Sequence, residues 1–433
     1  MRPAVFALAL LVPAVAGAQP LAILAPPPAD PFLGESAPEG PEPFGAPIGL
    51  YDPSGQAMRA FHESLRRAEA GEDQARVVFY GASHVAADFF PQLVRQRLQE
   101  RFGDAGHGFV MPVRPWRGYR HLGGPTVEWI RQWSGLRIRA GSRAVEPLGV
   151  AGMAVETTRP TAWGRLDTAG LRAGRFVVHY LRQPGGGTFE LRVDGGRPLR
   201  VPTSADAMAP GLETIDGLAD GPHVLEVRAR GDGPVRLFGV SVEREHAGVI
   251  VDTMGLNGAR ASSQLLWQQD LHEPALRSLR PSLVVLAYGT NESGDDSPIE
   301  RYEEELLRVV GRVRGVVPSA SCLLIGPSDR PLRAGGELVE RPRTREIIEV
   351  QRRVARALGC GFFDLVEFGG GPLSMVRWAA SDPPFAQRDL VHFTVRAYQR
   401  LGEVLHDAIM AGFTPARDEE RGAPMALSGS GSR

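Results

Sequence analysis

The chain has 433 residues, of which 43% are hydrophobic and 23% charged, a composition that excludes a disordered polymer and a bundle of membrane helices. Its 49 basic and 50 acidic side chains give a net charge of -1, so no electrostatic argument favours a nucleic acid or an anionic membrane as partner. The sequence contains no lysine. This excludes a phosphate-binding P-loop lysine, a Schiff-base lysine and a Ser-x-x-Lys nucleophile pair, because each needs an ammonium group at a fixed place.

The first 18 residues predict an export signal. Arg2 precedes an apolar run from Ala4 to Val15, and Ala16-Gly17-Ala18 has the small-x-small form of a signal-peptidase site. The apolar run is too short to span a bilayer, which takes about 20 residues. We therefore expect cleavage after Ala18, export to the periplasm or cell envelope, and a mature chain without an integral membrane span.

Apolar strands alternate with amphipathic helices in two parts of the chain, which is typical of a parallel sheet covered by helices on both faces. The first part contains a predicted helix at 54–71, a strand at 77–80 and a helix at 87–102. In the second part we expect strands at 249–251, 283–287, 323–325 and 362–365 and helices at 259–271, 299–316, 345–358 and 395–409.

The pattern changes between these two parts. From about Thr126 to Ala247 the sequence is rich in Gly and Pro, and Phe189, Leu191 and Val193 alternate with charged residues, as in half-exposed antiparallel strands. We therefore predict an all-β module inserted into an α/β domain. The predicted division is a signal peptide at 1–18, a Pro-rich linker at 19–48, the α/β domain at 49–125 and 248–413, the β module at 126–247 and a disordered tail at 414–433.

The α/β pattern contains a serine near its start and an Asp-x-x-His segment near its end. Ser83 comes just after the first strand, where it could be a nucleophile if a base lies within hydrogen-bond reach, although a serine in this place is more often a helix cap. Asp389 precedes His392 by three residues. This spacing lets the carboxylate accept the Nδ1 proton and leaves Nε2 for the serine, but it also suits an ordinary helix entry.

Two further segments after strands could stabilise an oxyanion. Asn291, in Gly-Thr-Asn, could donate its side-chain amide, whereas its ordinary role would be that of a turn residue. In Gly-Leu-Asn-Gly, a backbone amide of Gly255 or Gly258 could be a second donor. We prefer Gly258 because it should open the next helix.

Together these segments resemble the SGNH, or GDSL-type, hydrolase family. The early Gly-x-Ser-His, the Gly-His-Gly-Phe at 106–109, the β insertion, Gly-Leu-Asn-Gly and Gly-Thr-Asn-Glu resemble bacterial peptidoglycan O-acetylesterases over about 73–413. The resemblance implies a three-layer, flavodoxin-like α/β domain with a parallel sheet and an inserted jelly-roll-like, carbohydrate-binding module. It also implies a serine esterase that removes O-acetyl groups from a cell-wall glycan and needs no cofactor or metal.

The resemblance assigns a role to each site residue. It implies that Ser83 is the nucleophile, His392 the base and Asp389 the group that orients the imidazole. It implies an oxyanion hole formed by the amides of Ser83 and Gly258 and the side chain of Asn291.

One residue departs from the family pattern. Ala82 replaces the aspartate of Gly-Asp-Ser, and alanine cannot bond neighbouring amides as a short carboxylate does. The substitution keeps open a glycan-binding protein with a decayed site. A second alternative is an O-acetyltransferase that uses the same residues and passes the acetyl group to a sugar hydroxyl.

Other conspicuous residues have ordinary alternatives. Trp116 and Tyr119 are candidates for stacking on a sugar, but packing between the two modules is an equal alternative. His84 lies beside Gly-rich turns without regularly spaced partners, so we expect no metal site. Cys322 and Cys360 precede successive apolar strands and could form a disulfide in an oxidising compartment or remain buried thiols.

Overall fold

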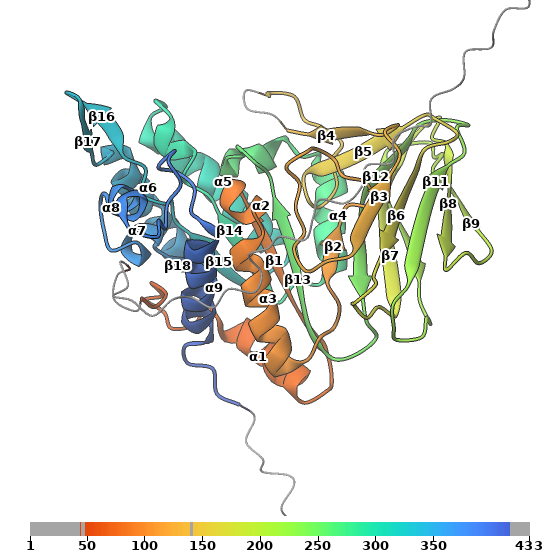
Figure 1. Cartoon of the computed structure of the whole chain (residues 1–433), viewed down its shortest axis with the longest axis horizontal. Helices are drawn as coiled ribbons and strands as arrows, with labels where there is room; N and C mark the ends of the chain where they lie inside the picture. Colours follow the sequence, from red (N-terminus) through yellow and green to blue (C-terminus); the bar gives the residue numbers. More distant parts are fainter. Residues whose placement is uncertain (1–43, 45–47, 139–141, 416–433) are drawn as a thin grey trace, which may run out of the picture.

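The computed structural model describes residue 44 and residues 48–138 and 142–415. The predicted export signal and most of the Pro-rich segment and tail therefore lie outside the described residues. An α/β part and a part made of antiparallel sheets lie side by side (Figure 1). No helix in the described ranges is both long enough and apolar enough to cross a bilayer.

A parallel sheet forms the centre of the α/β part. Its strand order is β13-β1-β14-β15-β18, and every neighbouring pair is parallel. When these five strands are numbered 1 to 5 in chain order, the sheet order is 2-1-3-4-5. This is the order of flavodoxin-like folds, which confirms the predicted fold class. The strands are β1 (Gln74–Gly81), β13 (Gly248–Gly255), β14 (Leu283–Ala287), β15 (Ser321–Ile325) and β18 (Gly361–Phe363).

Helices cover both faces of this sheet. Along β1, Val77 and Phe79 pack into the core under α1, α3 and α9, whereas Val78 and Tyr80 pack into the core shared with α4, α5 and α6. Alternate residues of one strand thus fill two different cores. The helices are α1 (Arg59–Glu69), α2 (Ser83–Ala86), α3 (Phe89–Phe102), α4 (Gln269–Leu279), α5 (Ile299–Val316), α6 (Pro342–Leu358), α7 (Leu365–Phe368), α8 (Ser374–Ala380) and α9 (Val395–Met410).

Several predicted bounds shift by a few residues, as for the helix expected at 54–71 and the strand expected at 362–365, and two predicted helices are each broken into two. The expected helix at 87–102 is preceded by the separate turn α2, because Asp88 adopts a left-handed conformation with φ 62°. The expected helix at 259–271 is a 3₁₀ helix, η1 (Ala261–Leu266), followed by α4, because Trp267 and Gln268 have extended ψ angles. The short 3₁₀ helix η2 (Glu292–Gly294) and the hairpin β16 (Leu332–Ala334) and β17 (Glu337–Val339) complete the α/β part.

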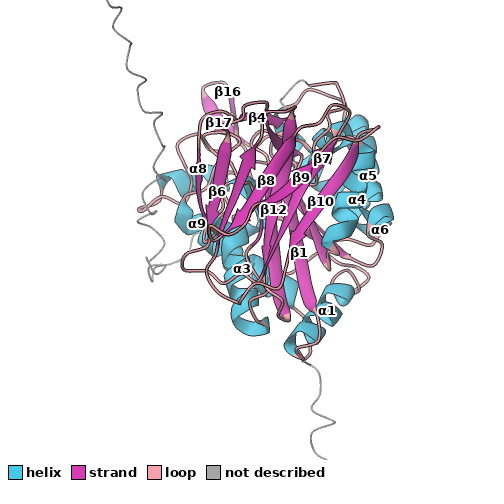
Figure 2. Ribbon diagram, turned by 90° about the vertical axis from the view of Figure 1, so that its right-hand side faces the viewer, coloured by secondary structure: helices cyan, strands magenta, loops and turns pink. Residues whose placement is uncertain are grey.

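The remaining strands form two antiparallel sheets, which Figure 2 shows in front of the helices. One sheet has the order β10-β7-β12-β5-β4 with β2 also paired to β12, and the other has the order β3-β6-β11-β8-β9. β2 precedes the predicted module start at 126, so the module and the α/β part share a strand pairing. The strands are β2 (Gly108–Val110), β3 (Thr126–Trp129), β4 (Ser134–Arg137), β5 (Met153–Thr157), β6 (Trp163–Asp167), β7 (Arg175–Arg182), β8 (Thr188–Val193), β9 (Leu199–Pro202), β10 (Ala209–Ile215), β11 (Val224–Ala229) and β12 (Val235–Glu243).

The two cysteines form a disulfide. Cys322 is the second residue of β15, and Cys360 immediately precedes β18. The bond therefore joins neighbouring parallel strands at their amino ends. Of the two alternatives that the sequence left open, a disulfide and two buried thiols, the structure has the disulfide.

Candidate active site

Ser83 is the first residue of α2, at the carboxyl end of β1. Two glycines make room for this turn. A Cβ on Gly81 would lie 2.3 Å from Val85 Cγ2, and a Cβ on Gly255 would lie 2.1 Å from the backbone nitrogen of Ala86. Any larger residue would push α2 away from the sheet, so these glycines set the position of Ser83.

The structure brings Ser83, His392 and Asp389 into a hydrogen-bonded row. His392 Nε2 lies 2.8 Å from Ser83 Oγ, and its Nδ1 lies 2.6 Å from Asp389 Oδ2. The other carboxylate oxygen, Oδ1, accepts the amides of Val391 and His392 at 3.0 Å each. This tight turn requires a left-handed Leu390, with φ 55°. The carboxylate therefore fixes both the imidazole ring and the backbone that carries it.

The ionised carboxylate of Asp389 selects one tautomer of a neutral His392 ring. Burial acts to raise the pKa of Asp389, but the hydrogen bonds from the His392 side chain and from the amides of His392 and Val391 outweigh it and hold the pKa below its ordinary value. An ionised carboxylate accepts but does not donate, so Nδ1 carries the ring proton. Nε2 of a neutral ring is then free to take the proton of the Ser83 hydroxyl.

The third segment, after β14, lies against the loop after β13. Asn291 donates one Nδ2 hydrogen to the carbonyl of Ala259 at 2.9 Å, and its second amide hydrogen remains available. Buried Glu292 accepts the amide of Ala261 at 2.8 Å and that of Gly289 at 3.0 Å. These bonds hold the Asn291 segment against the Gly258 loop. The sequence did not predict this role of Glu292, although Glu292 is the last residue of the Gly-Thr-Asn-Glu motif.

Gly258 occupies a turn and does not open a helix, so the reason for preferring it was wrong. η1 begins at Ala261 with Arg260 as its N-cap. Gly258 has φ 77°, is exposed, and its amide donates no hydrogen bond to any other described residue. Gly255, by contrast, is paired within β13 beside Gly81. The amide of Ser83 begins α2 and has no partner within that helix.

The β module contacts the loop that contains Gly258. Arg137, at the end of β4, donates to the carbonyl of Asn257 at 3.4 Å, and its guanidinium lies 4.7 Å from the ring centroid of Trp116. Tyr119 is buried, packs edge-on against Trp116, and its hydroxyl accepts the amide of Met111 at 3.0 Å. The structure thus favours packing over sugar stacking for Tyr119, and it makes Trp116 a support for Arg137.

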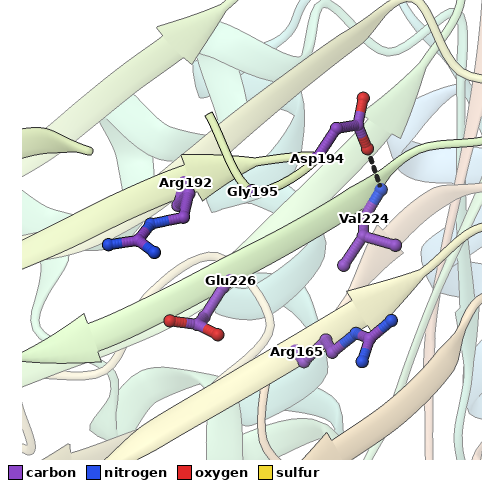
Figure 3. Close-up of a pocket in the computed structure, with 6 residues that line it drawn as sticks. All are labelled: Arg165, Arg192, Asp194, Gly195, Val224 and Glu226. Atoms are coloured by element: carbon purple, nitrogen blue, oxygen red, sulfur yellow. Dashed lines mark hydrogen bonds between the residues drawn. The ribbon is translucent and has the colours of Figure 1, made fainter. Parts of the chain in front are cut away.

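The described ranges hold no metal cluster, and one of their pockets lies on the β module. No group of three or more potential metal ligands is found there. A shallow pocket of about 290 Å³ lies on the β module, where Arg165, Glu226 and Arg192 project from β6, β11 and β8 (Figure 3). Asp194 lines it too and accepts the amide of Val224 at 2.8 Å. Its lining contains no aromatic ring for a sugar to stack on.

Comparisons with known proteins match one family and several solved structures. Residues 216–400 match the GDSL-like Lipase/Acylhydrolase family. A solved structure titled "Peptidoglycan O-acetylesterase in action, 5 min" shares 26% identity, covers 84% of this chain and 98% of its own, and superposes with a TM-score of 0.70. Family two carbohydrate esterases from Clostridium thermocellum and Cellvibrio japonicus share 14% and 11% identity, cover 60% and 64% of this chain and 94% and 98% of their own, and give TM-scores of 0.26 and 0.27. No curated protein matches the chain.

These findings define the class of protein. The chain is a carboxylic ester hydrolase, and the resemblance to SGNH hydrolases predicted from the sequence is confirmed. Over most of both chains it is similar to a peptidoglycan O-acetylesterase.

Proposed function

We propose that the protein removes O-acetyl groups from a cell-wall glycan, with peptidoglycan as the substrate, through an acetyl-enzyme on Ser83. The observation that carries the proposal is the 2.8 Å contact between Ser83 Oγ and His392 Nε2, with Asp389 on the far side of the ring. The choice of substrate is supported by the similarity to a peptidoglycan O-acetylesterase along 84% of the chain.

The proposed reaction has two halves. Ser83 Oγ attacks the acetyl carbonyl carbon while its proton passes to His392 Nε2. The resulting oxyanion accepts hydrogen bonds from the amides of Ser83 and Gly258 and from the side chain of Asn291. The C–O bond to the sugar then breaks, and the sugar oxygen takes the proton from Nε2. Water, deprotonated by His392, attacks the acetyl-enzyme, and acetate leaves as Ser83 recovers its proton.

Exposure of the site favours hydrolysis over transfer to a second sugar. The side chains of His392 and Asp389 are 35% and 47% exposed, so water has access to the base that would deprotonate it. A decayed, purely glycan-binding site is disfavoured because the contacts of the three residues are complete. Ala82 itself makes no side-chain cap on α2, so these contacts form without the aspartate of the family pattern.

Acetate release tests the proposal. Purified protein should release acetate from O-acetylated peptidoglycan and none from the same material after chemical deacetylation, and Ser83→Ala should abolish release while the far-UV circular dichroism stays unchanged. If the acetyl group appears only as a new ester on an added sugar acceptor, the protein is a transferase and not an esterase. Undiminished release by Ser83→Ala would overturn the assignment of the nucleophile.

Export is part of the proposal and is supported by the sequence of residues 1–18. Expression of the full chain followed by cell fractionation should place the protein in the periplasm or envelope, with an N-terminus at Gln19. A cytoplasmic protein that keeps Met1 would contradict it.

A further inference from the structure

A buried hydrogen-bond network lies behind the nucleophile, the base and the side-chain amide donor. These three groups are not members of the network. The network includes His84 and Thr290, which are next to Ser83 and Asn291 in the chain, and it packs against the ring of Phe393, which is next to His392. Since each of these three segments enters the site from a different element, a network that joins their neighbours can fix their relative positions.

His84 is the centre of the network. Its Nδ1 lies 2.9 Å from the Tyr398 hydroxyl, and its Nε2 lies 3.2 Å from the Ser328 hydroxyl. Ser328 reaches Thr290 twice, because its Oγ lies 3.3 Å from Thr290 Oγ1 and its amide donates to the same oxygen at 3.1 Å. His84, Tyr398, Ser328 and Thr290 are all buried, with Ser328 wholly inaccessible.

The donors and acceptors of this network fit a neutral His84. The Tyr398 ring packs against that of Phe393, with centroids 5.1 Å apart, and its hydroxyl can donate the phenol proton to His84 Nδ1. Nε2 then carries the ring proton and donates it to Ser328 Oγ. Burial, with His392 nearby, lowers the pKa of His84 to about 3, so the ring stays neutral near pH 7.

We propose that His84 is a positioning residue, which bridges Tyr398 and Ser328 and thereby holds the turn that carries Ser83 in register with the base and the amide donor. The proposal rests on the proposed function. His84 lies behind the reacting groups, with its ring centroid 5.7 Å from that of His392, and it takes no part in proton transfer.

Removing one hydroxyl at a time tests this role without altering a reacting group. Ser328→Ala cuts the branch toward Asn291, and Tyr398→Phe cuts the branch toward His392. We expect each to lower kcat for 4-nitrophenyl acetate about 10-fold, with KM changed less than about twofold, because misplacement of reacting groups lowers the rate and leaves binding intact.

The chain provides a matched control. Ser241, on β12, is also wholly inaccessible, and its Oγ lies 3.2 Å from His179 Nε2, so Ser241→Ala removes the same kind of contact from the β module. We expect Ser241→Ala and Ser328→Ala to lower Tm by similar amounts, but only Ser328→Ala to lower kcat. Equal kcat values for these two variants, with Tyr398→Phe as active as the wild type, would overturn the positioning role.

A double-variant cycle separates positioning from a general loss of structure. If Ser328 acts through Thr290 on Asn291, then Ser328→Ala should cost less than about twofold in kcat once Asn291→Ala has removed the donor. Losses that multiply fully would contradict the link. A wild-type protein with no turnover at all would overturn the proposed function as well, whereas an active wild type with insensitive variants overturns only the role of His84.

Discussion

Ser83 Oγ and His392 Nε2 lie 2.8 Å apart although 309 positions separate them in the chain. The packing of the helices that follow the two residues explains the contact. α3 begins six residues after Ser83, α9 begins three residues after His392, and Gly402 on α9 sits so close to α3 that a Cβ there would lie 2.8 Å from Leu93 Cβ. This close crossing brings the serine and the imidazole together.

Asp389→Asn should lower kcat without unfolding the protein. The neutral amide can donate a proton to Nδ1, which would leave Nε2 protonated and unable to accept the serine proton. The effect in buried triads is about 10⁴-fold, and we expect at least about 100-fold here because Asp389 is partly exposed. Steady-state kinetics on 4-nitrophenyl acetate measure it, and a loss of less than about tenfold would show that the carboxylate has little part in orienting His392.

Asn291→Ala should lower kcat about 10²- to 10³-fold, since it removes one oxyanion donor. KM for the small ester should change little, because the donor acts mainly on the charged transition state. Asn291→Asp is the informative companion, because it keeps the size of the side chain and replaces the donor with a charge that repels an oxyanion. An Asp variant as active as the wild type would exclude Asn291 from the oxyanion hole.

Gly255→Ala should lower both stability and kcat. The added Cβ would lie 2.1 Å from the backbone nitrogen of Ala86, so α2 and with it Ser83 must move. Gly311→Ala is the control, because Gly311 lies inside α5 with no atom within 4 Å of an added Cβ and should gain about 1 kcal/mol of stability. Thermal melts and turnover measure both variants, and unchanged turnover in Gly255→Ala would contradict the tight seat of α2.

Replacing both cysteines should reduce stability but not catalysis. The bond between Cys322 and Cys360 closes a loop of 38 residues, for which loop entropy predicts about 4 kcal/mol. The bond lies at the amino ends of β15 and β18, whereas Ser83 follows the carboxyl end of β1. Urea unfolding of Cys322→Ala/Cys360→Ala should show the loss, and kcat at 25 °C should match the wild type. A fall in kcat would reveal a coupling between the two ends of the sheet.

Stability should fall as the pH drops from about 6.5 toward 4. Burial lowers the pKa of His84 and His272 to about 3 and that of His121 and His179 to about 4, so below pH 6.5 the unfolded chain binds more protons than the folded one. Burial raises the pKa of Asp88 to about 6 and also raises the pKa of Asp252, Glu292 and Asp329, and these four carboxyl groups have the opposite sign. Burial lowers the pKa of His62 and His107 as well, which adds to the loss of stability on acidification.

Unfolding measured at several pH values tests this sum. Each such histidine contributes a slope of about 1.4 kcal/mol per pH unit in the range between its two pKa values. His272→Gln removes one such histidine and should make the curve shallower by one such contribution. A free energy of unfolding that is flat or rises on acidification would contradict neutral, buried histidines.

The sequence alone determined the elements whose signals are local. The apolar run 283–287 is β14 and the amphipathic stretch 299–316 is α5, residue for residue, because strand and helix periodicity are written within a few turns of chain. The candidate site was also visible in part, since Ser83, Asn291 and the Asp389 to His392 segment each follow a strand or precede a helix, and parallel strands bring such places to one edge.

Only the tertiary structure decided which of these residues meet and what supports them. The break at Asp88, the free amide of Gly258, the reach of Arg137 to Asn257 and the bond between the two cysteines depend on neighbours that are distant in the chain. The bridge from His84 to Ser328 spans 244 positions, and no spacing rule relates two residues so far apart. Contacts of this kind form when whole helices and strands pack together. The local sequence of one segment does not specify which distant segment it packs against.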